Sequence, residues 1–247
     1  MSRFVILSGP SCVGKGPLYS ALRKFYPDLA DNLQQVVLYN SRDPRPGERE
    51  GVDYYFRSRA KIEELAKKSG YTSAIVRGDL QAIELASIRA ILDQGRDAFF
   101  EGNPFIPAKL SELSELQEIP TLKVFLAPLS RDEILFLKDP LQRTDLEKLL
   151  PDIMRRKLLR RTKRQKTILS LKDLENIEQR VASAIVELRE AWKFDYVIPN
   201  HDGEDSEHWD AFYYPIGDAR KALLAFAALL QGETPPRVEK WEKDLLP

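Results

Sequence analysis

A glycine-rich segment near the start of the chain constrains the fold more than any other feature of the sequence. Residues 9–16 read Gly-Pro-Ser-Cys-Val-Gly-Lys-Gly and directly follow the apolar run at residues 4–7. The spacing G-x-x-x-x-G-K is typical of a loop whose backbone N–H groups converge on phosphate oxygens, while the lysine adds a positive charge. A helix predicted over residues 18–25 would direct the positive end of its dipole at the same anion. The sequence therefore predicts a strand, a phosphate-binding loop and a helix, in that order.

The position after the lysine departs from the usual pattern of such loops. Gly16 and Pro17 stand where a serine or threonine would place a hydroxyl group on magnesium. Proline removes one N–H but is well tolerated at the first position of a helix. We therefore still predict a nucleotide-phosphate site, with Cys12 as a bystander. The residues expected at this site are Gly9, Ser11, Cys12, Val13, Gly14, Lys15, Gly16 and Pro17.

Composition predicts a single-core protein without a nucleic-acid partner. The chain has 247 residues, of which 43% are hydrophobic and 31% are charged, so it can bury one α/β core with an inserted lid. Its 38 basic and 38 acidic residues balance, which disfavours nucleic acid. A single cysteine excludes a disulfide framework, and the N-terminal residues resemble neither a signal peptide nor a membrane span. We expect a cytoplasmic protein with no membrane partner, either monomeric or a homodimer.

Apolar runs typical of strands alternate with helical patterns along the chain, as a parallel doubly wound sheet requires. A polar tail begins at Gly232 and is expected to pack loosely. The predicted strands cover residues 4–7, 35–39, 97–100, 121–126 and 196–198, and the predicted helices after the first cover residues 60–68, 80–94, 107–116, 174–192 and 217–230.

A second group of charged and turn-forming residues lies at positions 41–56. It contains Ser-Arg-Asp-Pro-Arg-Pro-Gly-Glu at residues 41–48 and Gly-Val-Asp-Tyr-Tyr-Phe at residues 51–56. Arg42 and Arg45 occupy a turn stiffened by two prolines and can converge on one phosphate, and Tyr54 adds a hydroxyl group. Taken alone, the segment is equally consistent with a solvated basic turn. Its position downstream of the loop favours a second phosphate site.

Together the two segments resemble the guanylate kinase family, whose pattern is a G-P-S-G-x-G-K loop followed by T-T-R-x-P-R-x-G-E-x-x-G-x-D-Y-x-F. The second motif is matched at nearly every position, and the resemblance extends over residues 3–202. It implies an α/β P-loop kinase with a parallel doubly wound sheet, an acceptor-binding subdomain and a helical lid. The implied kinase domain is 1–231, with a core at 1–33, 95–134 and 193–231, an acceptor-binding region at 34–94, an insertion and lid at 135–192, and a tail at 232–247.

The resemblance also implies a role for individual residues. Arg42, Arg45 and Tyr54 would hold the phosphate of the acceptor nucleotide, and Asn200 would lie near the adenine of the ATP donor. The residues implied in catalysis are Lys15, Arg42, Arg161 and Arg180, the last two acting from the lid.

The part of the pattern that reads guanine is rewritten in this chain. Where the family has a glutamate, a tyrosine and an aspartate, this sequence has Thr72, Gln81 and Asn103, while Glu101 keeps an acidic group at the end of a strand. A buried carboxylate that accepts two base N–H groups discriminates guanine better than an amide does. Thr72, Gln81, Glu101 and Asn103 are therefore predicted to contact the acceptor.

The densest run of positive charge lies at residues 155–166. Such a run is most often a solvated helical surface, and nucleic acid is a second interpretation. The resemblance favours a third, because Lys157-Leu158-x-x-Arg161 is similar to the R-L-x-x-R of the family's lid. The separation from Arg161 to Arg180 is longer than in the family, and residues 135–152 form an apparent insertion.

The sequence thus predicts an ATP-dependent phosphotransferase acting on GMP or a related nucleoside monophosphate. Mg²⁺ would be held mainly by phosphates and water, with no protein metal site. Two alternatives stay open at this point: a kinase of the same fold for another phosphorylated acceptor, and a non-catalytic binding module. The intact Gly9, Gly14 and Lys15 argue against the module, and Pro17 is its best support.

Overall fold

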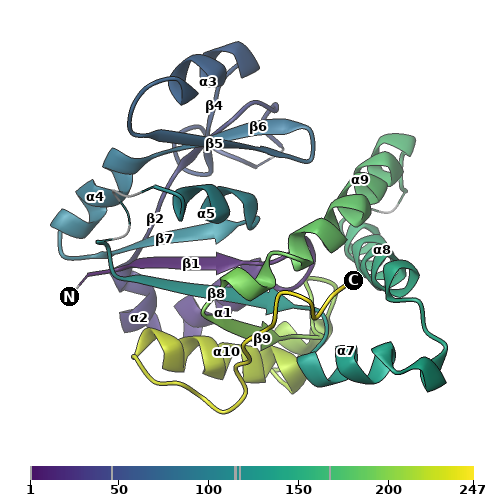
Figure 1. Cartoon of the computed structure of the whole chain (residues 1–247). Helices are drawn as coiled ribbons and strands as arrows, with labels where there is room; N and C mark the ends of the chain where they lie inside the picture. Colours follow the sequence, from purple (N-terminus) through teal and green to yellow (C-terminus); the bar gives the residue numbers. More distant parts are fainter. Residues whose placement is uncertain (1, 46, 114–115, 117, 167) are drawn as a thin grey trace. The chain divides into compact units, whose positions relative to one another are not determined.

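The chain forms two compact units in a computed structural model. The model describes every residue except 1, 46, 114, 115, 117 and 167 (Figure 1). The first unit contains the N-terminal residues to Ile6 and residues 32–122, and the second contains residues 7–31 and 123–247. Pro46 of the predicted phosphate turn and the end of the predicted helix at 107–116 fall partly outside the described residues.

A five-stranded sheet has the strand order β2-β7-β1-β8-β9. In the first unit β2 pairs with β7 in parallel, with Leu33 opposite Asp97, and in the second β8 pairs with β9 in parallel, with Val124 opposite Tyr196. Every residue of β1 is buried, as expected for a strand covered on both faces. The predicted α/β class with a parallel sheet is confirmed. The strands are β1 (Phe4–Ser8), β2 (Leu33–Gln35), β7 (Asp97–Gly102), β8 (Thr121–Ala127) and β9 (Tyr196–Pro199).

The first unit also contains a four-stranded sheet with the order β4-β3-β6-β5. Its strands β5 and β6 form a hairpin whose turn residues Arg77 and Gly78 both have positive φ, at 55° and 90°, as a type I′ turn requires. The elements around it are β3 (Leu38–Asn40), β4 (Tyr54–Phe56), α3 (Arg59–Ala66), β5 (Tyr71–Val76), β6 (Asp79–Glu84), α4 (Leu85–Asp93) and α5 (Phe105–Leu110).

Several sequence predictions for the first unit were wrong in detail. The predicted helix at 80–94 is a strand over its first residues, because Gly78 turns the chain back and residues 80–83 are buried within the sheet. The predicted strand at 35–39 is divided between β2 and β3, while β4 and β5 were missed. The helix predicted at 107–116 is observed as α5, which begins and ends earlier.

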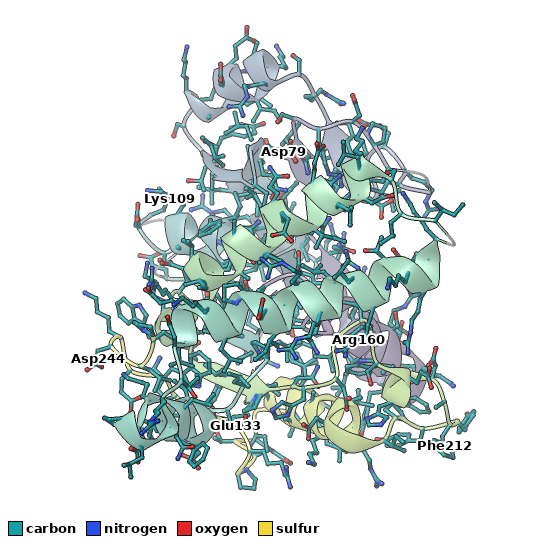
Figure 2. All side chains as sticks on the ribbon, turned by 90° about the vertical axis from the view of Figure 1, so that its right-hand side faces the viewer. Asp79, Lys109, Glu133, Arg160, Phe212 and Asp244 are labelled. Carbon is teal, nitrogen blue, oxygen red and sulfur yellow. The ribbon has the colours of Figure 1, made fainter. Side chains whose placement is uncertain are left out.

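Helices dominate the second unit. The long pair α8 and α9 lies side by side, joined by a short connection, and Figure 2 shows both helices lengthwise with Arg160 on α8. The predicted helix at 174–192 corresponds to α9, which begins earlier and ends at Leu188. The helices are α1 (Lys15–Phe25), α2 (Pro27–Asn32, ending in the first unit), α7 (Arg131–Lys138), α8 (Leu146–Gln165), α9 (Leu171–Leu188) and α10 (Gly217–Leu230), with short 3₁₀ turns η1 (Pro140–Gln142), η2 (Ala191–Lys193) and η3 (Glu207–Trp209). Within the described residues, none of the helices combines the length and the apolar character needed to cross a bilayer.

The C-terminal segment is packed against the second unit, so the prediction that residues 232–247 pack loosely is wrong. Trp241 and Leu245 are each only 4% exposed. Val197 and Glu239 exchange two backbone hydrogen bonds of 2.8 Å, and Glu242 accepts from both Nε and Nη2 of Arg131. Three apolar side chains, those of Trp241, Leu245 and Leu246, are buried and fix this otherwise charged segment. The polar composition of the segment did not reveal this packing.

Trp241→Ala tests this packing. We expect the substitution to lower the free energy of unfolding by about 3–5 kcal/mol, since a buried tryptophan leaves a large cavity. Lys243→Ala in the same segment removes only an exposed side chain and should change stability by less than about 0.5 kcal/mol. Denaturant unfolding measures both. Equal, small effects would mean that the segment is loosely attached after all.

Candidate functional site

The phosphate-binding loop joins β1 to α1 in the second unit. At two of its glycines the backbone conformation and the surrounding atoms exclude any residue with a Cβ atom. Gly9 and Gly14 have φ of 140° and 97°, which favour glycine. A Cβ atom on Gly9 would lie 2.4 Å from the carbonyl oxygen of Leu126, and one on Gly14 would lie 2.7 Å from the side-chain nitrogen of Asn200. The loop backbone therefore packs directly against Leu126 and Asn200. Glycines at these positions give the loop the close backbone approach that a phosphate-binding loop needs.

Lys15 begins α1 and is buried with its amine folded back over the loop. Its Nζ donates to the carbonyl oxygens of Gly9 at 2.7 Å and Pro10 at 2.8 Å. The helix predicted from residue 18 therefore starts three residues earlier, which makes Pro17 its third residue rather than its first. The N–H groups of the first turn have no partner within a helix, so the proline costs no helical hydrogen bond there.

Two arginines of the helices α8 and α9 lie beside the loop. Arg180 on α9 donates from Nη1 to the hydroxyl of Ser11 at 3.0 Å. The Nε of Arg161 on α8 is buried and has no hydrogen-bond partner among the described residues, and its charge acts on the neighbouring Cys12. Ser11, Arg161 and Arg180 thus place two guanidinium groups beside a loop built for anions.

The basic run of α8 is anchored by an acidic residue that sequence reasoning missed. Asp205 accepts from Nε of Arg160 at 2.8 Å and lies 3.4 Å from Nζ of Lys157. Lys157 also donates to the carbonyl oxygen of His201 at 2.6 Å, and Arg164 pairs with Glu207 at 3.0 Å. The run is therefore not a freely solvated helix face. The acidic residues in the loop after β9 were visible in the sequence, but the sequence did not indicate that the basic residues of α8 are their partners.

Cys12 packs between the loop and the helices α8 and α9. Its side chain lies in a buried cluster with Leu158, Ile177 and Val181. Burial, followed by the nearby Glu204 carboxylate, raises the pKa of the Cys12 thiol to about 12. The thiol is therefore protonated at neutral pH, and its Sγ donates to Oδ1 of Asp205 at 4.0 Å.

Asn200 holds the loop from the strand side. It is fully buried, and its side-chain nitrogen donates to the carbonyl oxygens of Val13 at 2.8 Å and Asp202 at 2.7 Å. Both amide hydrogens are used in this way. This placement supports a role in shaping the loop and does not support the predicted contact with adenine.

The arginine motif of the first unit is organised around Glu48. Arg42 makes two hydrogen bonds to this carboxylate, at 2.7 and 2.6 Å, and its guanidinium lies 5.2 Å from the ring centre of Tyr54. Glu48 also accepts from the backbone N–H of Arg45 at 2.7 Å. Burial raises the pKa of Glu48, but the hydrogen bonds from Arg42 and Arg45 outweigh it, so the pKa is lowered overall. Burial raises the pKa of Tyr54, which therefore keeps its proton. The motif presents an arginine with a fixed orientation, and Glu48 was not singled out from the sequence.

The residues predicted to read the acceptor base lie on neighbouring strands of the same unit. Gln81 on β6 pairs with Asn40 on β3 and with Ala74 on β5, and Thr72 occupies the same face of β5 as Ala74. Asn103, just after β7, donates to Gln81 at 3.3 Å. Glu101 lies within β7, half-buried. The structure therefore brings Gln81 and Asn103 together, and it adds Asn40, which was not predicted.

A pocket of about 470 Å³ in the second unit contains a histidine clamped between two carboxylates. His201 Nε2 lies 2.9 Å from Glu133, and its Nδ1 lies 2.5 Å from Asp218. Burial lowers the pKa of His201, but hydrogen bonds to Asp218 and Glu133 outweigh burial and raise it overall. His201 lies at the surface, and its two carboxylate partners are far from it in the sequence and were not foreseen.

A parallel α/β sheet with a lysine-bearing phosphate loop and arginines on a helical lid defines the P-loop class of phosphotransferase-like proteins. The family model for guanylate kinase matches residues 1–155. A guanylate kinase of Synechococcus sp. (strain JA-3-3Ab) is 30% identical over 86% of this chain and 82% of its own length, and one of Rhodococcus jostii (strain RHA1) is 30% identical over 81% of each. The crystal structure of guanylate kinase from Anaplasma phagocytophilum has the same fold, with a TM-score of 0.55, 18% identity and coverage of 96% of this chain and 89% of the other. The chain belongs to the guanylate kinase family.

The buried thiol gives a chemical test of the loop and lid. Cys12 is the single cysteine in the sequence and is 1% exposed. We expect alkylation by iodoacetamide at about pH 8 to be at least a hundredfold slower in the folded protein than in denaturant, because little thiolate forms and little of it is accessible. Mass spectrometry follows the reaction. Equal rates would show that Cys12 is not buried by the lid helices.

The clamped histidine predicts a pH-dependent contribution to stability. Because the folded-state pKa of His201 is raised, its contribution is present below the ordinary value of about 6.5 and is lost as pH rises through the folded-state value. His201→Gln should therefore lower the free energy of unfolding at about pH 5.5 by no more than about 1 kcal/mol, since the ring is half exposed, and by less at about pH 9. Urea unfolding of both proteins at both pH values measures this. A loss that is larger at alkaline pH would contradict the clamp.

Proposed function

We propose that this chain transfers the γ-phosphoryl group of ATP to the phosphate of GMP or a related nucleoside monophosphate. The observation that carries the proposal is the loop of residues 9–15, with Lys15 folded over it and Arg180 bonded to Ser11. Its relatives of 30% identity are guanylate kinases, which supports the same reaction for this chain. An oxygen of the acceptor phosphate attacks the γ-phosphorus directly, the bond to the β-phosphate oxygen breaks, and ADP leaves.

The donor half of the reaction belongs to the second unit. The loop N–H groups and the start of α1 would bind the ATP phosphates, and Lys15 would exchange its carbonyl contacts for phosphate oxygens. Arg161 and Arg180 would neutralise charge on the transferring group, a role in which one arginine is worth about a thousandfold in rate or more. The Nε of Arg161, which is buried and has no hydrogen-bond partner in the part of the chain that the structure describes, supports this assignment.

The acceptor half belongs to the first unit. Arg42 and Arg45 would bind the acceptor phosphate, with the Tyr54 hydroxyl beside them. Since Glu48 fixes the guanidinium of Arg42 through two hydrogen bonds, that side chain is oriented before the nucleotide arrives. Such preorganisation saves the entropy of ordering a long side chain on binding.

Magnesium fits this site only as a companion of the nucleotide. Gly16 and Pro17 offer no hydroxyl group, and the described residues contain no cluster of three or more histidine, cysteine or acidic side chains arranged for a metal. We therefore assign Mg²⁺ to the ATP phosphates and water, where it would offset their charge. The chain's own part in the reaction is to bind, to orient and to supply positive charge. The partners are thus small nucleotides, and we place the protein in the cytoplasm, where they are abundant.

Lys15→Ala tests the proposal. With Mg-ATP and GMP we expect at least a hundredfold loss in kcat, the size typical of removing one group that stabilises developing charge. ADP release is measured in a coupled assay. Lys109→Ala, which removes an exposed lysine from α5, is the matched control and should keep full activity. Unchanged turnover in Lys15→Ala, with folding intact by circular dichroism, would disprove the role of the loop.

A further inference from the structure

A carboxylate that the proposed mechanism does not use lies against the phosphate-binding loop. Glu204 follows Gly203, where a Cβ atom would lie only 2.0 Å from the carbonyl oxygen of Cys12. Glu204 also precedes Asp205, whose Oδ1 accepts from Sγ of Cys12 at 4.0 Å. Both chain neighbours of Glu204 therefore lie against the same loop residue, and they hold Glu204 beside the loop.

Arg161 reaches the same place from the helix α8. Leu158 packs against Cys12 in a buried cluster, and Arg161 follows Leu158 by three residues, which places both on one face of the helix. Burial does most to raise the pKa of the Cys12 thiol; after it, the Glu204 carboxylate raises the pKa and the Arg161 guanidinium lowers it. A carboxylate and a guanidinium group thus lie beside one thiol.

Two other charged groups act on this thiol, and they are paired with each other. These are Asp205 and Lys157, which lie 3.4 Å apart, and Asp205 also accepts from Nε of Arg160 at 2.8 Å. The groups that remain are Glu204 and Arg161. Among the residues that the structure describes, Oε2 of Glu204 and Nε of Arg161 are both buried and have no hydrogen-bond partner.

The two unsatisfied atoms are chemically complementary. A buried polar atom without a partner costs free energy, and the cost is larger when the group is charged. A hydrogen bond from Nε of Arg161 to Oε2 of Glu204 would remove both costs. Because a guanidinium group has five N–H donors in a fixed plane, this bond uses one donor and leaves four, on the two Nη atoms, for a phosphate group.

We propose that Glu204 is a positioning residue, which pairs with Nε of Arg161 and orients the guanidinium group so that its Nη atoms face the phosphoryl group in transfer. The inference rests on the proposed function, because it names the residue that orients an arginine of that reaction. Glu204 does not touch the nucleotide in this role. It acts through Arg161, as Glu48 acts through Arg42 in the first unit.

The experiment is a double-mutant cycle of Glu204→Ala and Arg161→Gln, measured as kcat and KM with Mg-ATP and GMP. Arg161→Gln should lower kcat by about a thousandfold. Glu204→Ala should lower kcat by about tenfold with little change in KM, because Arg161 is still present but poorly oriented. In the Arg161→Gln background, Glu204→Ala should have no further effect. Glu204→Gln, which keeps an acceptor for Nε, should recover most of the loss.

Glu175→Ala removes an exposed carboxylate from α9 and is the matched control, with kcat unchanged. Equal losses from Glu204→Ala in the presence and in the absence of Arg161 would overturn the inference while leaving the kinase function standing. They would show that Glu204 supports the loop and does not act through the arginine. Full activity of Glu204→Ala would overturn the inference as well.

A second cycle, on folding, tests the pair without turnover. It decides the inference even if the natural chain transfers no phosphate, which would overturn the proposed function. Urea unfolding gives the folding equilibrium constant of the natural chain, of Glu204→Ala, of Arg161→Gln and of the double variant. The loss in the double variant should be about fivefold smaller than the product of the two single losses, because the two buried groups interact. Losses that simply multiply would overturn the pairing.

Discussion

The position of the phosphate-binding loop depends on how tightly the segment after β9 lies against it. The side chain of Asn200 donates to the carbonyl oxygen of Val13. A Cβ atom on Gly203 would lie only 2.0 Å from the carbonyl oxygen of Cys12. No side chain fits between these two stretches of backbone, and the hydrogen bond from Asn200 holds the loop in this position. An anion site made of backbone depends on such external support, because it has few side chains of its own to fix it.

The same segment connects the loop to the lid. Asp205 is buried and faces Lys157 and Arg160 of α8, while Cys12 packs against apolar side chains of α8 and α9. Burying a carboxylate with two cationic partners costs desolvation free energy, and removing one partner costs more because a charge is left buried and unpaired. Such a group therefore fixes the position of α8 relative to the loop more than it adds stability. The basic helix α8 therefore has one face that is committed to ion pairs, while Arg161 lies apart from those pairs, close enough to Cys12 for its charge to act on the thiol.

Local features could be predicted from the sequence, and distant partnerships could not. The loop was foreseen because its glycines and lysine act within seven residues, and the arginine motif because its two arginines lie in one turn. The strand β6 was mistaken for helix because residues 80–84 continue into α4 without a glycine or proline, and periodicity does not separate a short buried strand from a helix. Glu48 was passed over within a motif already read for its arginines. Asp205 lies 45 positions from Arg160 in the sequence, and the local sequence around either residue does not predict their ion pair.

Cys12 makes the packing of α8 and α9 against the loop accessible to measurement by thiol labelling. The thiol is 1% exposed and packs against side chains of α8 and α9, so its modification in the folded protein requires a local opening. When reclosure outpaces the reagent, the labelling rate reports the equilibrium between closed and open forms; when the reagent is faster, it reports the opening rate itself. Since the sequence contains one cysteine, the signal has a single source. A nucleotide that binds the closed form would lower the labelling rate of Cys12. The size of that decrease would rank nucleotides by how strongly they stabilise the closed form.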